Sequence, residues 1–260
     1  MTALPHSADA AEVGITLEAG RIEGRCAPAF APVLDAFRRN FEAHGEVGAS
    51  VAIVRDGETV VDLWGGMADP AAGRAWTADT VVVVFSCTKA ATAMAAHVLA
   101  DKGRLDLDAP VASLWPEFAA AGKADVTTRM LLDHTAGLPA LREKLKPDCL
   151  LDWDYMTERL AAEEPFWPPG AQTGYHAITF GYLVGEVVRR AGGRSLGQVF
   201  AEEVAGPLGL DFWIGLPEAA EARIAPVILY RPAKGEAETP FIAAARQRGS
   251  IANLFVFNHG

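Results

Sequence analysis

Residues 81–103 read VVVVFSCTKAATAMAAHVLADKG, and this stretch decides the fold. Four valines and a phenylalanine at 81–85 have the length and composition of a short buried strand. From Thr88 the sequence becomes rich in alanine and methionine, which favours a helix that ends at Gly103. The junction between the predicted strand and the predicted helix therefore falls on Ser86.

Ser86 and Lys89 are spaced so that both side chains share one face of the first helical turn. A serine hydroxyl is a weak nucleophile and needs a nearby base, which Lys89 can supply. A helix N-terminus adds backbone N–H groups and a positive partial charge, and both favour an oxyanion. The same spacing also occurs by chance, as a capping serine followed by an exposed lysine. Because a buried strand precedes the pair and an alanine-rich helix follows it, we expect Ser86 to be a nucleophile activated by Lys89.

The N-terminal part predicts a helix and the start of an antiparallel sheet. Residues 1–27 are predicted to be a flexible leader, and residues 28–44 carry apolar side chains at helical spacing. Two strand-like runs, 47–54 and 59–64, flank Arg55-Asp56-Gly57-Glu58. Asp-Gly between such runs is a strong hairpin signal.

The rest of the chain predicts helices followed by a return to strands. Helical segments are expected near 128–133, 152–162, 178–192 and 195–204, and the run IAPVILY at 224–230 is strand-like. This order indicates an α+β fold in one domain, 28–260. Its sheet lobe would comprise 28–85 and 218–260, and an all-helical lobe at 86–217 would be inserted into it.

Composition and charge narrow the class of partner. The formal net charge is −10 and the sequence pI is about 5.1, so we expect no nucleic acid and no anionic membrane as a partner. No uncharged apolar window reaches the roughly 18 residues that a membrane span needs. The N-terminal MTALPHSADAAEVG lacks the basic and apolar regions of a secretory signal, which predicts a cytoplasmic protein.

The cysteines predict neither disulfides nor a metal site. Cys26, Cys87 and Cys149 are odd in number and widely spaced, as expected of free thiols in a reducing compartment. No ligand cluster predicts a metal or an organic cofactor. Cys87 follows Ser86 directly and could act as an alternative nucleophile, but we expect it to be a small residue packed behind the serine.

Two further motifs lie downstream of Ser86. Tyr175 follows a Pro/Gly-rich loop at 165–174 (PFWPPGAQTG). A phenol close to a lysine ammonium can have a lowered pKa and relay protons, although an aromatic loop residue, taken alone, more often packs on the core. The second motif is LLDHTAGL at 131–138.

Taken together, these motifs resemble the serine β-lactamase and penicillin-binding-protein superfamily, for which S-x-x-K is a known signature. Within it the chain is most similar to the class C-like esterase branch, the family VIII carboxylesterases. LLDHTAGL stands where that family has an "LLxHTSGL"-like stretch. The loop from Pro169 to Ala177 matches its "PG…Y-x-N/S" loop, and FGYLVGEVVRRAGGRSLGQVFAEEVAGPLGL at 180–210 matches its helix pair. The resemblance covers residues from about 30 to 216.

The resemblance implies the roles of the site residues. Ser86 would be the nucleophile, Lys89 and Tyr175 would share the general-base and general-acid roles, and the backbone N–H of Ser86 would be one oxyanion donor. His134 would belong to a structural motif, and a Ser-His-Asp triad with Asp133 has no positional support.

The chain departs from the family pattern in two places. Ala177 replaces the Asn that usually binds a β-lactam side-chain carbonyl, which favours an esterase. The family's third motif, a K-T-G, H-G-G or W-G-G-like strand, normally lies far beyond the tyrosine loop, and we expect the similarity of Asn258-His259-Gly260 to it to be fortuitous. The C-terminal strands and helix of the family would then be missing from a truncated chain. An exposed sheet edge would favour self-association.

These observations predict a cofactor-independent serine hydrolase of short-chain carboxylic esters, with weak β-lactam hydrolysis. His176 and Ala177 are expected in the substrate pocket, and Trp153, Trp167 and Trp213 could shape its acyl-binding part or be ordinary core residues. One alternative is a β-lactamase or a DD-peptidase-like enzyme. Another is an inactive penicillin-recognising fold that serves as a binding protein, or a fragment.

Overall fold

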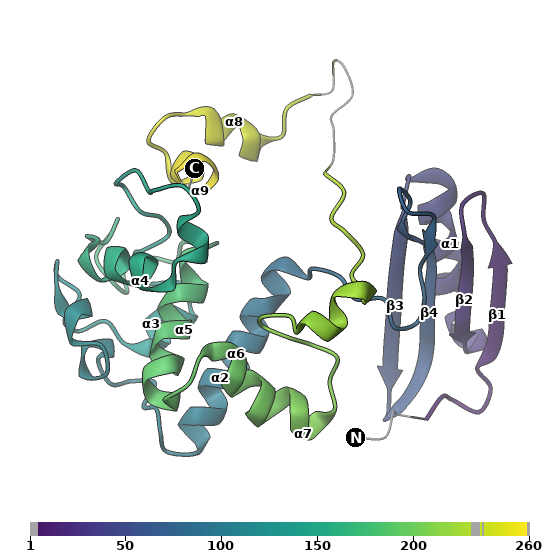
Figure 1. The fold of residues 1–260 in the computed structure, drawn as a ribbon, viewed down its shortest axis with the longest axis horizontal. Helices are drawn as coiled ribbons and strands as arrows, with labels where there is room; N and C mark the ends of the chain where they lie inside the picture. Colours follow the sequence, from purple (N-terminus) through teal and green to yellow (C-terminus); the bar gives the residue numbers. More distant parts are fainter. Residues whose placement is uncertain (1–4, 230–234, 236, 259–260) are drawn as a thin grey trace. The chain divides into compact units, whose positions relative to one another are not determined.

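The chain folds into two compact units, each described here by itself (Figure 1). The structure is a computed structural model that describes residues 5–229, 235 and 237–258. The sheet unit comprises the described residues up to Val83 together with 216–229. The helical unit comprises the described residues of 84–215 and of the C-terminal segment after 231.

The sheet unit is an antiparallel sheet with one long helix. Its elements are β1 (Ala11–Thr16), β2 (Arg21–Cys26), α1 (Ala31–Ala43), β3 (Gly48–Arg55), β4 (Glu58–Asp69) and β5 (Arg74–Ala75). The strand order is β1-β2-β4-β3, and β5 pairs with β4. Arg55 lies opposite Glu58, and both turn residues between them have positive φ, 53° at Asp56 and 83° at Gly57. This is the backbone of the tight turn that Asp-Gly favours, so the predicted hairpin is confirmed.

The core of the sheet unit lies between α1 and one face of the sheet (Figure 1). Phe37 of α1 is buried against Ile22 of β2 and against Val61 and Leu63 of β4. The central strand β4 pairs on both sides, with β2 and β3, which explains why its apolar residues are the most completely buried.

The prediction of a flexible leader at 1–27 is wrong for its described part. Ala11–Thr16 and Arg21–Cys26 pair in register and extend the sheet. Val13 and Ile15 on β1 pack against the same core as Ile22. Only alternate residues of β1 are partly buried, so the hydrophobic pattern of this edge strand is weak.

The helical unit is built around two long helices. Its elements are α2 (Thr88–Asp101), α3 (Thr128–Leu132), α4 (Trp153–Ala162), α5 (Thr179–Gly192), α6 (Leu196–Phe200), α7 (Gly206–Leu208), α8 (Pro240–Arg246) and α9 (Ile251–Phe257). The helices predicted from sequence are confirmed at α2, α3, α4, α5 and α6. Asp152 and Ser195 cap the starts of α4 and α6, and α5 ends before Gly193, which has a φ of 69°. A π-helical turn at Ala201–Ala205 follows α6.

The prediction that the C-terminal segment belongs to the sheet lobe is wrong. Residues 237–258 form α8 and α9 in the helical unit, and the hydroxyls of Thr239 and Ser250 cap these helices. After α9, the Asn258 side-chain amide donates to the carbonyls of Leu141, at 2.7 Å, and Glu143, at 2.8 Å. These caps and bonds explain why the segment joins the helices.

The two predicted strands at 81–85 and 224–230 reduce to one bridge between Val81 and Ile224. Val82 and Val83 are exposed, because a single bridge gives the valine run no sheet face to cover. Tyr230 lies outside the described residues.

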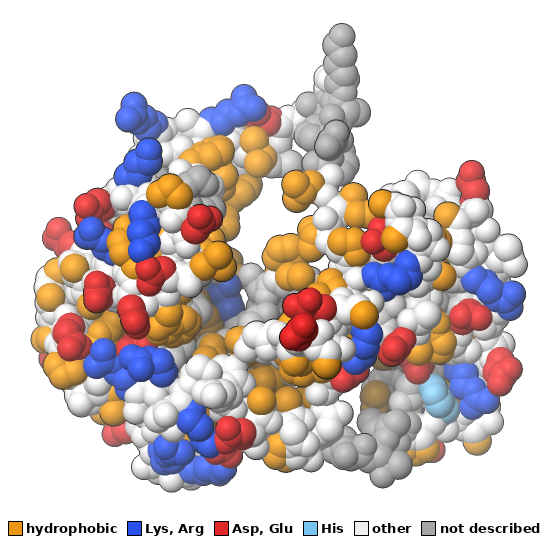
Figure 2. All heavy atoms as spheres, viewed as in Figure 1, with side chains coloured by type: hydrophobic (Ala, Val, Ile, Leu, Met, Phe, Trp, Pro, Cys, Tyr) orange, Lys and Arg blue, Asp and Glu red, His pale blue; other side chains and the backbone are white. Residues whose placement is uncertain are grey.

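Lys and Arg side chains are interspersed with Asp and Glu over the face of the helical unit drawn in Figure 2. The ion pairs of this unit include Arg159 with Glu143 at 2.7 Å and Lys146 with Asp152 at 2.5 Å, whose side chains are all exposed. Surface pairs of this kind each contribute little to stability. Within the described residues, no helix is both long and apolar enough to cross a bilayer.

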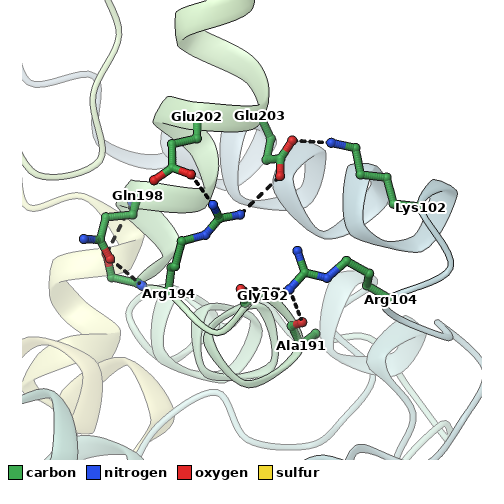
Figure 3. Close-up of polar contacts among 9 residues, drawn as sticks. Lys102, Arg104, Ala191, Gly192, Arg194, Gln198, Glu202 and Glu203 are labelled. Carbon is green, nitrogen blue, oxygen red and sulfur yellow. Dashed lines mark hydrogen bonds and ion pairs between the residues drawn. The ribbon is translucent and has the colours of Figure 1, made fainter.

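Charged side chains connect α2, α5 and the π-helical turn (Figure 3). Glu203 accepts from both Lys102 and Arg194, and Arg194 also pairs with Glu202. Beside them, Arg104 donates to the last carbonyls of α5, at 3.1 Å from Ala191 O and 2.9 Å from Gly192 O. A cation at a helix C-terminus satisfies free carbonyls and opposes the helix dipole.

We expect Arg104→Ala to lower the free energy of unfolding by about 1 kcal/mol, because two helix-terminal carbonyls lose a charged donor. Urea denaturation followed by tryptophan fluorescence measures the change. Arg248→Ala, at an exposed arginine of the same unit, is the control and should leave the midpoint in place. Equal midpoints for the two variants would contradict the capping role of Arg104.

Candidate active site

Ser86 lies in a single 3₁₀ turn, Phe85–Cys87, which leads directly into α2. The preceding residue, Phe85, has a φ of 45°, in the left-handed region that bulky side chains seldom occupy. This conformation turns the chain sharply before the helix. The serine side chain is therefore presented at the start of α2.

Lys89 follows in the first turn of α2, on the same face as Ser86. Its ammonium donates to Ser86 Oγ at 3.2 Å and to the carbonyl oxygen of Ala177 at 2.7 Å. The second bond joins the start of α2 to the segment just before α5. Lys89 is thus held by one side-chain oxygen and one backbone oxygen.

Tyr175 approaches Ser86 from the loop before α5. Its hydroxyl lies 2.7 Å from Ser86 Oγ, and its ring centroid lies 4.8 Å from Lys89 Nζ. The hydrogen bond with Ser86 lowers the pKa of the Tyr175 phenol, and partial burial opposes that effect. The nearby Lys89 ammonium lowers it further, because a phenolate gains a charged donor.

A cavity of about 980 Å³ opens at these three residues, and its walls are mostly apolar. It is lined by Phe85, Ser86, Thr88, Lys89, Thr92, Pro139, Tyr175, Ala177, Ile178, Phe180, Gly181, Phe241, Ile251, Ala252 and Phe255. Among the described residues that line this cavity, Lys89 is the one with a charged side chain.

Two histidines lie behind Tyr175. His176 is fully buried, and its Nε2 accepts from the backbone N–H of Leu138 at 2.9 Å while Nδ1 lies 2.5 Å from the carbonyl of Gly174. Burial lowers the pKa of His176 to about 4, so the ring is neutral at neutral pH. The proton of the neutral ring is therefore on Nδ1, and this N–H donates a hydrogen bond to the carbonyl oxygen of Gly174. The LLDHTAGL segment supplies the second histidine, His134, whose Nδ1 accepts from the backbone N–H of His176 at 3.1 Å.

Comparison with known proteins shows which family the chain belongs to. The family model described as Beta-lactamase matches residues 35–257. The chain belongs to the β-lactamase family. The resemblance drawn from the motifs and the predicted α+β fold are thereby confirmed.

The relatives of this β-lactamase-family chain include esterases. It is 43% identical over 211 residues to "Esterase/beta-lactamase LipL" of Mycobacterium tuberculosis, a match that covers 80% of this chain and 49% of LipL. A solved family VIII carboxylesterase is 50% identical with a TM-score of 0.75, covering 80% of this chain and 57% of that one. A penicillin-binding-protein homologue from Caulobacter crescentus is 44% identical with a TM-score of 0.77, covering 84% and 59%. The chain spans about half the length of the curated relatives it matches.

The structure brings together the three residues predicted to be catalytic, Ser86, Lys89 and Tyr175, within hydrogen-bond distance. Ala177 lines the cavity, as predicted. His176 does not line it, because its ring is buried between Leu138 and Gly174.

Trp153 also differs from the pocket expectation. Its indole nitrogen donates at 2.8 Å to Glu186, a buried carboxylate of α5, and its ring stacks against Tyr182. No tryptophan of the described chain is among the residues that line the cavity. Cys87 is exposed rather than packed behind the serine.

Sequence reasoning missed two features of the site. The carbonyl of Ala177 binds Lys89, and a backbone acceptor leaves no trace in residue type. The second feature is Phe85, whose backbone is strained at a positive φ and which also lines the cavity. The described residues hold no cluster of three His, Cys, Asp or Glu that could bind a metal. His259 and Gly260 of the expected chance match lie outside the described residues.

The buried His176 predicts a loss of stability on acidification. With a folded pKa of about 4, the ring resists the proton that the unfolded chain takes up near pH 6.5. The free energy of unfolding should therefore fall as the pH falls from 6.5 to 4, by up to roughly 3 kcal/mol.

We expect His176→Gln to flatten this pH dependence, because its amide oxygen can replace Nε2 as the acceptor and does not titrate. Denaturation midpoints at several pH values measure the slope. His97→Gln, at an exposed histidine of α2, should keep the parent's slope. A His176→Gln protein that loses as much stability as the parent between pH 6.5 and 4 would contradict the prediction.

Proposed function

We propose that the protein is a serine hydrolase that cleaves short-chain carboxylic esters through an acyl-enzyme on Ser86. The observation that carries the proposal is the pair of contacts at Ser86 Oγ, from Tyr175 at 2.7 Å and Lys89 at 3.2 Å, at an apolar cavity. The esterase relatives support the same activity.

In the acylation step, Ser86 Oγ attacks the ester carbonyl carbon and its proton passes to the Tyr175–Lys89 pair. The lowered pKa of Tyr175 makes the phenolate a fitting acceptor for that proton. The tetrahedral oxyanion is stabilised by the backbone N–H of Ser86 at the start of α2. When the C–O bond to the alcohol breaks, the pair returns the proton to the departing alkoxide.

In the deacylation step, the same groups act on water. The Tyr175–Lys89 pair takes a proton from a water molecule as its oxygen attacks the acyl carbon. The acid is released when the bond to Ser86 Oγ breaks and the proton returns to the serine. The cycle consumes one ester and one water and needs no cofactor.

The cavity favours neutral esters over β-lactams. A β-lactam such as nitrocefin carries a carboxylate and a side-chain amide, and both need polar partners once they leave water. The described part of the lining offers one cation, Lys89, which already bonds Ser86 and Ala177. At position 177 a methyl group stands where an amide would bind the side-chain carbonyl.

We expect Ser86→Ala to lower kcat/KM for p-nitrophenyl butyrate by at least about 10³-fold, because the acyl-enzyme cannot form. Initial rates measured at 405 nm test this. Cys87→Ala, at the exposed neighbour, is the control and should retain the parent rate.

Mass spectrometry after reaction with a slowly hydrolysed acylating agent should show one acyl group on Ser86. An unacylated Ser86 together with no turnover in the parent would instead favour a binding protein that lacks catalysis.

For the substrate preference, we expect kcat/KM for the butyrate ester to exceed that for nitrocefin by roughly 10- to 100-fold, because unpaired polar groups are costly. Ala177→Asn supplies the missing amide and should raise the nitrocefin value several-fold. Ala252→Asn places an amide elsewhere in the same cavity and should not. A parent that prefers nitrocefin would favour the β-lactamase alternative.

We also propose two properties that lie outside the site. The thiols of Cys26 and Cys87, which form no disulfide, support a reducing compartment, the cytoplasm. The edge strands β1 and β3 carry unpaired backbone groups that could mediate self-association, which light scattering at increasing protein concentration would detect.

A further inference from the structure

His134 holds both neighbours of Tyr175. Its carbonyl oxygen accepts from the backbone N–H of Gly174 at 3.1 Å, and its Nδ1 accepts from the backbone N–H of His176 at 3.1 Å. Two amides on either side of the proposed catalytic tyrosine are therefore fixed by one residue. The reach from carbonyl to Nδ1 depends on the φ of 65° at His134.

The ring of His134 also packs directly against the tyrosine. Its centroid lies 5.0 Å from the Tyr175 ring and 5.0 Å from the Phe180 ring of α5. Tyr175 itself is about half exposed, and its ring is held by the His134 ring together with the Lys89 ammonium.

Neighbouring backbone bonds tie the same two segments together. Thr135 O accepts from Gly170 N–H at 3.0 Å, and Gly137 O accepts from Phe166 N–H at 2.7 Å. Two bonds between the LLDHTAGL segment and the tyrosine loop depend on a titratable side chain: the bond to His134 Nδ1 and the bond from the Leu138 N–H to His176 Nε2. The pKa of His176 is about 4, so its ring stays neutral at mildly acidic pH.

We propose that His134 is a positioning residue that, as a neutral imidazole, holds the Tyr175 hydroxyl against Ser86 and makes turnover sensitive to acid. The proposal rests on the proposed hydrolase function of Ser86. His134 is not among the described residues that line the cavity, but its ring packs on Tyr175, which does line it, so its effect on Ser86 passes through Tyr175.

The charges around His134 support the neutral form. Burial lowers the pKa of His134 most, Lys89 of α2 lowers it further, and Asp133 at the end of α3 opposes them. Tyr175 and the neutral His176 face it from the loop. Protonation would convert Nδ1 from an acceptor into a donor that faces the His176 N–H. Turnover should therefore fall as the pH falls through the His134 pKa, below 6.5.

Two substitutions separate the acceptor from the backbone conformation. Asn and Gly both tolerate a positive φ, so neither strains position 134 as Ala would. The Asn side-chain oxygen stands as many bonds from the backbone as Nδ1 does, and it accepts without titrating. His134→Gly removes the acceptor and the ring.

We expect His134→Gly to lower kcat for p-nitrophenyl butyrate by about 10- to 100-fold with a smaller change in KM, because a displaced catalytic group costs rate. His134→Asn should recover most of that loss and should lack the acid limb of the kcat–pH profile. His97→Asn, at the exposed histidine of α2, should match the parent in both respects.

A double-variant cycle tests whether the effect passes through the tyrosine. In a Tyr175→Phe background, His134→Gly should cost less than about threefold further, since the positioned hydroxyl is already gone. Equal losses in the two backgrounds would overturn the proposal, as would an acid limb that persists in His134→Asn.

Hydrogen exchange gives a readout that does not depend on catalysis. Peptides that contain the amides of Gly174 and His176 should exchange at least several-fold faster in His134→Gly and near the parent rate in His134→Asn. Unchanged exchange in His134→Gly would overturn the positioning role. Failure of Ser86 acylation in the parent would count against the hydrolase proposal alone.

Discussion

The packing of α2 against α5 is the constraint on which the site depends. Ala91, Ala95 and Ala96 of α2 are buried in the same core as Leu183 and Val187 of α5. Small side chains on α2 let the two helix axes approach closely. Because Ser86 and Lys89 lie at the start of α2 and Tyr175 lies just before α5, this one contact brings all three together.

The bond from Lys89 to the Ala177 carbonyl closes that arrangement at the surface. An ammonium that leaves water needs acceptors. Here the backbone oxygen of Ala177, just before α5, accepts from Lys89 at the start of α2. The same bond orients Nζ towards Ser86 Oγ. The helix core thus sets the distance between the start of α2 and the segment before α5. The bond from Lys89 to Ala177 sets how these two segments are aligned.

Local signals in the sequence were sufficient for most of the helical unit. Capping residues such as Asp152 and Ser195, and terminating glycines such as Gly103 and Gly193, mark helix ends through backbone chemistry alone. The Asp56-Gly57 turn fixed the hairpin in the same way. Ser86, Lys89 and Tyr175 could be named because their motifs are specific, although their contacts span 89 residues of sequence between Ser86 and Tyr175.

The errors arose where tertiary partners decide the structure. Residues 81–85 and 224–229 have strand composition, yet among them only Val81 and Ile224 form a bridge, so composition overstated the strands. The sequence left open whether Trp153 faces the cavity or the core, and in the structure its partly exposed indole instead donates to a buried carboxylate, Glu186. β1 was missed because an edge strand with one half-buried face carries little hydrophobic signal.

Phe85 shows why the position of the proposed nucleophile, Ser86, costs local stability. A positive φ in a bulky residue is strained by roughly 1–2 kcal/mol, and it persists only where surrounding contacts hold it. The exposed ring gives Phe85 little burial with which to offset that cost, so the strain must be supported by the turn and by α2. The gain is geometric, because the sharp turn sets Ser86 Oγ between an ammonium and a phenol before any substrate binds. Preorganisation of this kind is what a weak nucleophile needs, since the groups that accept its proton and stabilise the oxyanion do not have to move during the reaction.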